Sequence, residues 1–298
     1  MANVGWAYKE IAARTLLCLA LSFAGPSALA EGAAPLGLLD ETMLHPVDAF
    51  TGSTLRAGEI IYNQSVASLP LPSWAMVGVT DWLTVNVDFV SILGGLAIEP
   101  HYPLPSINMR FRLAEADGLL PDLAFEAMYF RLWEPFEDQL DPKNTVRLER
   151  DGATAFARVN ATWPLSAHAR VHASTGLTWT EYIRIENRNR EVLRGRTIRN
   201  GFNPDASLAF DWRPLPWMSL HISASYGSTF VYLDLVPRKA EIAYGARFAP
   251  FYLARGGFLR ALRVEAAAFA MYFRDAEEWL FLPVPVYPVL YWQWELGG

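Results

Sequence analysis

Apolar and small polar residues alternate along much of this chain, most clearly from Met218 to Tyr232. Successive side chains of an extended strand point to opposite faces, so Ile222 and Ala224 share one face while Ser223 and Ser225 share the other. Soluble sheets usually use strands of about five to six residues. A tilted strand of about 9–11 residues crosses a membrane in a β-barrel, with one face toward lipid and the other toward the lumen. The pattern therefore predicts a transmembrane β-strand.

The same period of two recurs from residue 57 onward. Bacterial single-chain barrels have an even number of strands, short periplasmic turns and longer outer loops. The long connections here, 134–151 and 187–203, fall on the side opposite the short turns, as that rule requires. We therefore expect an all-β fold, a closed antiparallel transmembrane β-barrel of about 12 strands in the cell outer membrane. The expected strands are 57–66, 74–80, 83–90, 106–113, 123–132, 153–163, 167–185, 206–212, 218–232, 240–248, 262–272 and 283–296.

One predicted hairpin carries a family resemblance. The run from Val77 to Val85, VGVTDWLTV, resembles the short periplasmic hairpins of many bacterial outer-membrane β-barrel proteins. The likeness indicates the class, a small porin-like barrel or a barrel of an envelope machine, and names no member. It implies outer membrane lipid and lipopolysaccharide as surroundings, and the barrel-assembly machinery as a partner during insertion.

Composition favours strands over helices as the spanning elements. Hydrophobic residues make up 52% and charged residues 19% of the 298 residues, and the mean hydropathy is only +0.12. The 11 Trp, 12 Tyr and 17 Phe suit aromatic girdles at the two membrane interfaces. An aromatic-rich soluble β-sandwich is the alternative. The net charge of −6 gives no reason to expect nucleic acid as a partner.

Residues 1–30 have the features of a secretory signal peptide. Lys9 and Arg14 supply the positive n-region, and Ala28-Leu29-Ala30 supplies a small-residue cleavage site after a short apolar core. The chain's one cysteine, Cys18, lies in that core, so the mature protein would have no disulfide and no thiol chemistry. Residues 31–56 lack a strand period and are expected to form a periplasmic or lumen segment, followed by the barrel over 57–298.

Charged residues of both signs fall on the inward face of the predicted strands. They would line a charge-selective constriction for an anionic or zwitterionic solute. Alternatively, the two signs pair across neighbouring strands and fill the lumen, because buried charges need partners. Arg158 and Arg170 lie on adjacent strands, so a basic ladder between them is the first candidate for selectivity. The lumen-lining candidates are Arg110, Arg112, Glu126, Arg158, Arg170, His172, Asp211, Glu241, Arg247, Arg263 and Glu265.

A cluster of arginines follows the strand expected at 167–185. Charge-assisted hydrogen bonds to phosphate would let these residues contact lipopolysaccharide from an outer loop. A solvated basic loop is the alternative. The residues are Arg188, Arg190, Arg194, Arg196 and Arg199.

Catalysis has weak support in the sequence. His168 and His172 share a strand face but are about 13 Å apart at ~3.3 Å per residue, too far for one metal site. His221 lies near Ser223 and Ser225, the residue types of a base and a nucleophile. These serines belong to a face of small polar residues with no nucleophile motif around them. We therefore expect no enzymatic activity, no catalytic residue, no metal site and no cofactor.

Two functions stand close together on the sequence alone. The first is a narrow pore for small solutes across the outer membrane, favoured by the lumen arginines. The second is a non-conducting structural barrel subunit of an envelope-spanning machine for secretion, polysaccharide export or gliding motility, with periplasmic or outer-membrane complex partners. Residues 31–56 and the balanced lumen charges favour the second. An outer-membrane lipid-modifying enzyme is a third alternative.

Overall fold

Nearly all of the described chain is β-strand. The computed structural model describes residues 38–39, 41–42, 50–65, 74–88, 107–141, 144–188, 191–227, 238–254, 257–273, 278–282 and 289–295, with only the backbone course given over 130–154 and 180–200. The predicted signal peptide, residues 1–30, lies outside these ranges. The elements are β1 (Glu59–Ser65), β2 (Trp74–Thr80), β3 (Leu83–Asp88), β4 (Ile107–Ala114), β5 (Asp122–Asp141), β6 (Asn144–Pro164), β7 (Ala169–Arg188), β8 (Glu191–Leu215), β9 (Met218–Tyr226), β10 (Arg238–Phe248), α3 (Gly257–Ala261), β11 (Leu262–Phe273), β12 (Glu278–Leu282) and β13 (Val289–Glu295).

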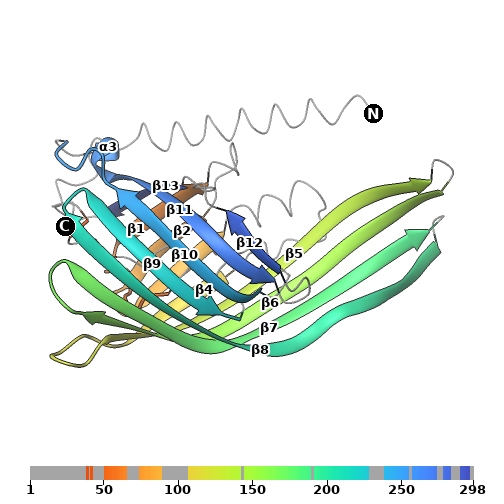
Figure 1. Ribbon diagram of the computed structural model, residues 1–298, viewed down its shortest axis with the longest axis horizontal. Coiled ribbons are helices and arrows are strands. Elements are labelled where there is room, and N and C mark those ends of the chain that lie inside the picture. The colour runs from red at the N-terminus through yellow and green to blue at the C-terminus, as the bar shows by residue number, and fades with distance from the viewer. Residues whose placement is uncertain are drawn as a thin grey trace.

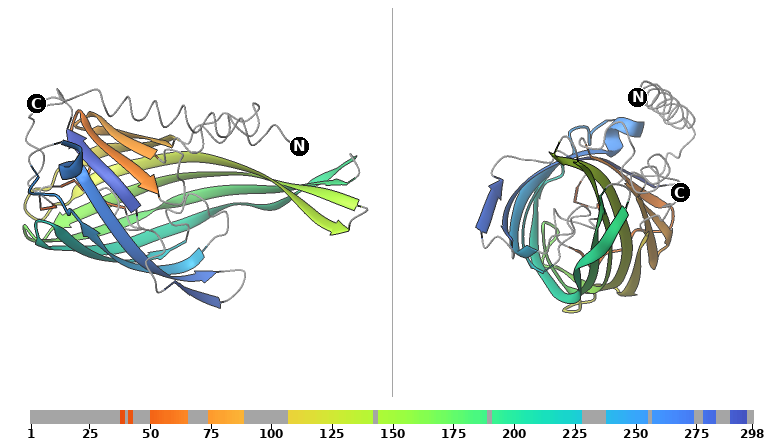
Figure 2. Two further views of the ribbon diagram at one scale, coloured as in Figure 1. Left: turned by 90° about the horizontal axis from the view of Figure 1, so that it is seen from above. Right: turned by 90° about the vertical axis from the view of Figure 1, so that its right-hand side faces the viewer.

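The strands close into one antiparallel ring, seen end-on in the right-hand view of Figure 2. Each strand from β1 to β11 pairs with its neighbour in sequence, and β13 joins β11 to β1. In the described part of the chain β12 pairs only with β11, so 12 of the 13 strands form the ring. The expected closed antiparallel barrel of about twelve strands is confirmed.

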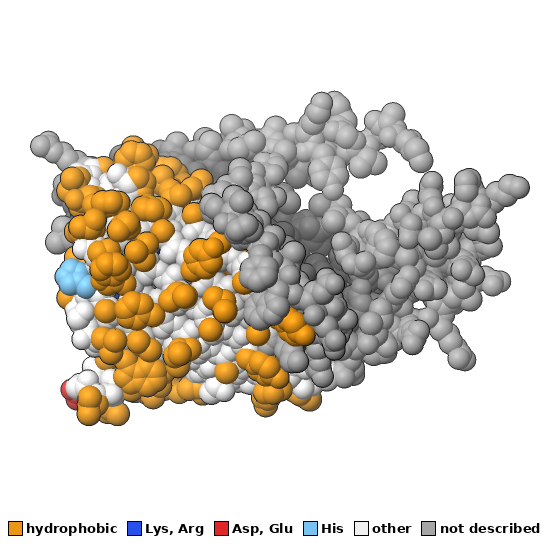
Figure 3. All heavy atoms as spheres, in the orientation of Figure 1, with side chains coloured by type: hydrophobic (Ala, Val, Ile, Leu, Met, Phe, Trp, Pro, Cys, Tyr) orange, Lys and Arg blue, Asp and Glu red, His pale blue; other side chains and the backbone are white. Residues whose placement is uncertain are grey.

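The alternation in the sequence becomes the two faces of the barrel wall. Along β9, Ser219 is 0% exposed and His221 4%, whereas Ile222 is 51% and Tyr226 55% exposed. Figure 3 shows hydrophobic side chains spread over the outer face of the ring. Soluble proteins rarely expose so continuous an apolar surface, whereas a lipid-facing barrel wall requires one. The chain is an outer-membrane β-barrel. Its exposed apolar side chains include Ile107, Met109, Val159, Leu177, Leu208, Phe210, Ile242 and Tyr244.

The prediction of long outer loops at 134–151 and 187–203 is wrong, because strands occupy most of both ranges. β5 pairs with β6, and β7 with β8, almost to the tips of their hairpins. The register places Glu134 opposite Arg150, and opposite charges on facing strands stabilise an antiparallel ladder. Many charged residues in a segment therefore do not by themselves indicate a loop, because charges of opposite sign can face each other on paired strands. These four strands extend well past the ring, on the side away from the short turns (Figure 1).

The closing strand also differs from the expectation. Within the predicted strand 283–296, the structure describes β13, and it adds β12, which the sequence did not predict. Both run antiparallel to β11. The sequence between them contains three prolines, which lack the N–H that a strand ladder uses. Among the described residues, no helix is long and apolar enough to cross a membrane.

Candidate functional site in the barrel lumen

Part of the N-terminal region contacts the inward face of the barrel. We call its described residues the plug segment, made of a charged anchor (residues 38, 39, 41 and 42) and a packed anchor (residues 50–56). Leu38 is 1% exposed, Glu41 2%, Phe50 2% and Leu55 0%. The sequence left residues 31–56 open between periplasm and lumen. The described part of that range lies in the lumen, against side chains from β6, β8, β10 and β11.

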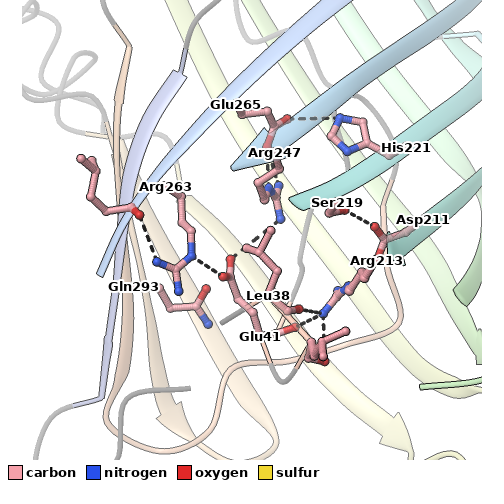
Figure 4. A network of polar contacts seen from close by, with 12 residues as sticks. Leu38, Glu41, Asp211, Arg213, Ser219, His221, Arg247, Arg263, Glu265 and Gln293 are labelled. Atoms are coloured by element: carbon pink, nitrogen blue, oxygen red, sulfur yellow. Dashed lines mark hydrogen bonds and ion pairs between the residues drawn. The ribbon is translucent and has the colours of Figure 1, made fainter. Parts of the chain in front are cut away.

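The side chain of Glu41 is held by arginines from two neighbouring strands (Figure 4). Glu41 Oε2 accepts a hydrogen bond from Arg263 Nε of β11 at 2.6 Å, and Glu41 Oε1 lies 4.0 Å from Arg247 Nη1 of β10. Arg247 also donates to Glu265 Oε2, with an Nη2 to Oε2 distance of 2.6 Å. Glu265 Oε1 in turn lies 3.8 Å from His221 Nε2. The charged anchor is therefore fixed by buried ion pairs. Removing one partner of such a pair destabilises the structure by several kcal/mol, because the other charge is left buried without compensation.

Arg213 of β8 holds the backbone of the charged anchor. Its Nη1 donates to the carbonyl oxygens of Glu41 at 2.9 Å and Leu39 at 3.3 Å, and also to the carbonyl of Leu38. Its Nε donates to Asp211 Oδ2 at 2.7 Å. Sequence reasoning missed Arg213 because it was assigned to a turn. Its position two residues after Asp211 continues the inward period of β8 and would have identified it.

Two more contacts secure this end of the plug segment. Leu38 N donates to Pro216 O at 2.7 Å, and Arg170 Nη2 donates to Leu39 O at 3.3 Å. Arg170 was predicted to act in the lumen, and its hydrogen bond here is to the chain's own backbone. The charged anchor therefore contacts β8, β10 and β11 together with the half-buried Arg170 of β7.

The packed anchor begins with an aromatic contact. The Cζ atom of Arg158 lies 4.1 Å from the ring centroid of Phe50 and 4.0 Å from that of Phe156. The two rings contact each other edge to face at 5.7 Å. Arg158 Nε also donates to Asp205 Oδ1 at 2.7 Å, so the guanidinium is paired as well as stacked. Cation–π contacts in such desolvated positions contribute about 2 kcal/mol.

The packed anchor then approaches the wall backbone closely. Gly52 N donates to Thr162 Oγ1 at 2.8 Å. A Cβ atom at Gly52 would lie 2.0 Å from Asp122 O, so only glycine permits this approach. Leu55 N donates to Thr84 Oγ1 at 2.8 Å. The Leu55 side chain packs with buried side chains of β1 and β2.

Most of the predicted lumen residues are buried on the inner face. The exceptions are Arg112 and Arg170, which are half-buried. Arg110 pairs with Glu126 at 2.7 Å, and its Nη1 donates to Ser53 O of the plug segment at 3.1 Å. The buried predicted residues are Arg110, Glu126, Arg158, His172, Asp211, Glu241, Arg247, Arg263 and Glu265.

The basic ladder expected between Arg158 and Arg170 does not form. Arg158 lies opposite Gly176, whereas Arg170 lies opposite Pro164. The two arginines are therefore six residues apart along β7, about 20 Å at ~3.3 Å per residue. Adjacency of strands was read correctly, but the register separates these side chains. Each arginine instead faces acidic or carbonyl partners of its own.

The lipopolysaccharide prediction falls on residues without described side chains. Arg188, Arg194, Arg196 and Arg199 lie in the extended strands β7 and β8, and Arg190 lies outside the described residues. The contact with lipopolysaccharide stays a prediction. Within the described ranges, no three His, Cys, Asp or Glu residues gather in a way that would hold a metal ion.

No protein-family model matches this chain, and no curated protein matches its sequence. Solved structures resemble it at low identity. The translocator domain of the autotransporter NalP from Neisseria meningitidis is 10% identical, with 98% of each chain covered and a TM-score of 0.46. An outer membrane channel from Pseudomonas putida F1 is 11% identical over 83% of this chain and 98% of that one, with a TM-score of 0.33. The Pseudomonas putida toluene transporter TodX is 10% identical over 85% and 97%, with a TM-score of 0.27.

Proposed function

We propose that this protein is a plugged pore, which passes small polar solutes across the outer membrane when the plug segment shifts. The observation that carries the proposal is that the charged anchor of the plug segment is held in the lumen by hydrogen bonds and ion pairs. Water or a solute can replace such contacts one by one. The barrel wall has its own continuous ladder of strand pairs, so it does not need the plug segment to close.

The width and lining of the barrel support a pore. A ring of about eight strands is just wide enough for side chains to fill, and the diameter grows with strand number. The ring here has 12 strands, as counted in the described residues. Small hydroxyl side chains line part of the inner face, with Ser174 Oγ and Ser207 Oγ only 2.6 Å apart and Ser223 and Ser225 on the next strand.

A second function is favoured by the buried ion pairs within the wall. Arg110 pairs with Glu126, and Arg158 with Asp205. Such pairs stabilise a permanently filled lumen. A barrel of that kind would act as a non-conducting structural subunit of an envelope-spanning machine, with partners at its short-turn end. In the described residues no hydrogen bond joins His221 to Ser223 or Ser225, the pair considered above as a base and a nucleophile.

Planar-bilayer conductance separates the two functions. We would compare the wild-type protein, a Glu41→Gln variant and a variant lacking residues 31–56. Heat-modifiable migration on gels would verify that each barrel is folded. A pore predicts small or rare conductance steps in the wild type, more frequent steps in Glu41→Gln and a steady conductance in the deletion variant. Silence in all three folded proteins would reject the pore, and capture of a periplasmic partner by the wild type would then support the structural subunit.

A further inference from the structure

The Glu41 carboxylate occupies the position of a bound ligand rather than that of a wall residue. Glu41 is separated by 222 residues from Arg263, whose Nε lies 2.6 Å from its carboxylate. Its side chain lies on the lumen side of the wall, beside the side chains of Arg247 on β10 and Arg263 on β11 (Figure 4). Glu41 is 2% exposed and Arg263 2%. A carboxylate from the plug segment therefore fills a desolvated polar site that belongs to the wall.

The wall fixes both arginines of this site without help from Glu41. Arg263 Nη1 donates to Arg260 O at 2.7 Å and to Leu262 O at 3.0 Å, which directs Nε toward the lumen. Arg247 Nε donates to Glu265 Oε2 at 2.8 Å. When the donors of a binding site are already oriented, less conformational entropy is lost on binding, so the ligand binds more tightly. The carboxylate is the exchangeable part of the arrangement.

The carboxylates seen beside the arginines in Figure 4 come from different parts of the chain. Arg213 has a carboxylate from the wall in Asp211, and Arg247 has one in Glu265. The carboxylate at 2.6 Å from Arg263 comes from the plug segment. When the plug segment leaves, the site loses one negative charge. One monovalent anion of similar size would restore it.

We propose that Arg263 and Arg247 form a binding site for the carboxylate of a small organic acid, and that Glu41 occupies this site until the solute displaces it. The proposal rests on the proposed pore and names its solute class and its gating step. A carboxylate is favoured because the internal occupant is one. The solute competes with Glu41, the charged anchor detaches, and the packed anchor keeps the plug segment attached to the wall.

The test measures release of the charged anchor in the full-length protein. A Leu39→Cys substitution, made together with Cys18→Ser, places one thiol beside Glu41 and leaves the backbone carbonyl of residue 39 in place. Its reaction rate with a polar maleimide is measured in detergent, with sodium propionate as the probe because propionate has the shape of the Glu41 side chain. Sodium chloride and sodium phosphate at equal ionic strength are the comparison salts.

Propionate should raise the labelling rate in a saturable manner. When the propionate concentration is about ten times the dissociation constant of propionate from the released state, the released population should rise about tenfold. Chloride and phosphate should leave the rate nearly unchanged. Equal acceleration by chloride would mean simple screening of ion pairs, and equal acceleration by phosphate would remove the preference for carboxylates. Either result, or no acceleration at all, would overturn the proposal.

Matched variants identify the site. Arg263→Gln should abolish the response to propionate. Arg112→Gln should retain it, because Arg112 Nε donates its hydrogen bond to Thr54 Oγ1 of the packed anchor, at 2.9 Å. If Arg263→Gln does not fold, the Glu41→Gln variant tests instead whether propionate and Glu41 compete for the site. Without an internal competitor, it should bind propionate more tightly and show a larger propionate-dependent rise in thermal unfolding temperature than the wild type. An unchanged or smaller rise would contradict competition.

These measurements need no ion flow, so the two proposals fail separately. Propionate-dependent labelling in a barrel that never conducts would reject the pore and leave the carboxylate site standing. Conductance in Glu41→Gln without any propionate effect on labelling or unfolding would support the pore and reject the site.

Discussion

The two anchors of the plug segment are held in the lumen by different kinds of contact. Glu41 at the charged anchor lies in ion pairs with arginines of β10 and β11. At the packed anchor, Phe50 stacks on Arg158 and Gly52 touches the backbone of β5. Both are buried to a similar degree. Burial alone therefore does not say which part of the plug segment can be released.

The difference lies in what can replace each contact. Water and anions can solvate an arginine or a carboxylate, so an ion pair can exchange its partner. No solute reproduces the close fit of Gly52 against the wall, because that fit depends on the absence of a side chain. The charged anchor is built for exchange and the packed anchor for retention.

The largest effect is expected from Glu41→Gln. Breaking a buried ion pair costs about 3 kcal/mol or more, which is a change of about a hundredfold in local opening. Amide hydrogen exchange at Leu38, whose N–H bonds to Pro216 O, should accelerate by about that factor. The amide of Gly52 should change little. Equal acceleration at both amides would show that the two anchors open as one unit.

Gly52→Ala should act on the packed anchor instead. The added Cβ would meet Asp122 O at 2.0 Å, and overpacking of this kind costs about 2 kcal/mol. Exchange at the amides of residues 52 and 55 should accelerate while that of Leu38 stays slow. Gly201→Ala is the control, because a Cβ there meets nothing within 4 Å. A Gly52→Ala protein with unchanged exchange would show that the wall moves to accept the methyl group.

Phe50→Leu should have a smaller effect at the same anchor. Leucine keeps an apolar side chain, and Arg158 keeps its contact with the Phe156 ring. Loss of the Phe50 ring alone should therefore cost about 1 kcal/mol, less than the full value of a desolvated cation–π contact. The measurement is the denaturant concentration at the midpoint of opening of the packed anchor, monitored by hydrogen exchange at the Gly52 amide. Because Arg158 keeps its hydrogen bond to Asp205, the barrel itself should unfold at the wild-type temperature. A lowered unfolding temperature would mean that Phe50 supports the wall as well as the plug segment.

Arg112→Gln should have the smallest effect. The side chain of Arg112 is 23% exposed and pairs with Glu115, which is 72% exposed. Exposed ion pairs contribute at most about 1 kcal/mol. Opening of the charged anchor, measured by the same exchange experiment, should stay within about 0.5 kcal/mol of the wild type. Opening of the packed anchor should become easier by at most about 1 kcal/mol, because the hydrogen bond from Arg112 Nε to Thr54 Oγ1 is lost. A larger change at the charged anchor would mean that Arg112 also holds that anchor.

The barrel wall could be predicted because its signal is local. A period of two fixes which side chains face lipid and which face the lumen, and β9 shows the predicted alternation residue by residue. The inward position of Arg263 followed from the same rule. Its contact with Glu41 did not, because nothing in the sequence around either residue specifies a partner 222 positions away.

The errors came from using composition in place of periodicity. Charged residues in 134–151 were read as a loop, although the facing strand offers complementary charges in register. Arg213 was read as part of a turn because prolines follow it. The ladder expected between Arg158 and Arg170 did not take the strand register into account. Register depends on where the turn begins, and the sequence of a single strand does not specify it.

The extension of β5 to β8 makes the barrel lopsided. β8 has 25 residues, about 80 Å of chain at ~3.3 Å per residue, whereas the hydrocarbon layer is about 30 Å thick. Much of β8 therefore extends beyond the hydrocarbon layer, at one edge of the four extended strands. The same strands carry Arg158 and Thr162 on β6 and Arg213 on β8, which contact the plug segment. Force applied at the tip of these strands would therefore reach, through the length of four strands, the part of the wall that contacts both anchors.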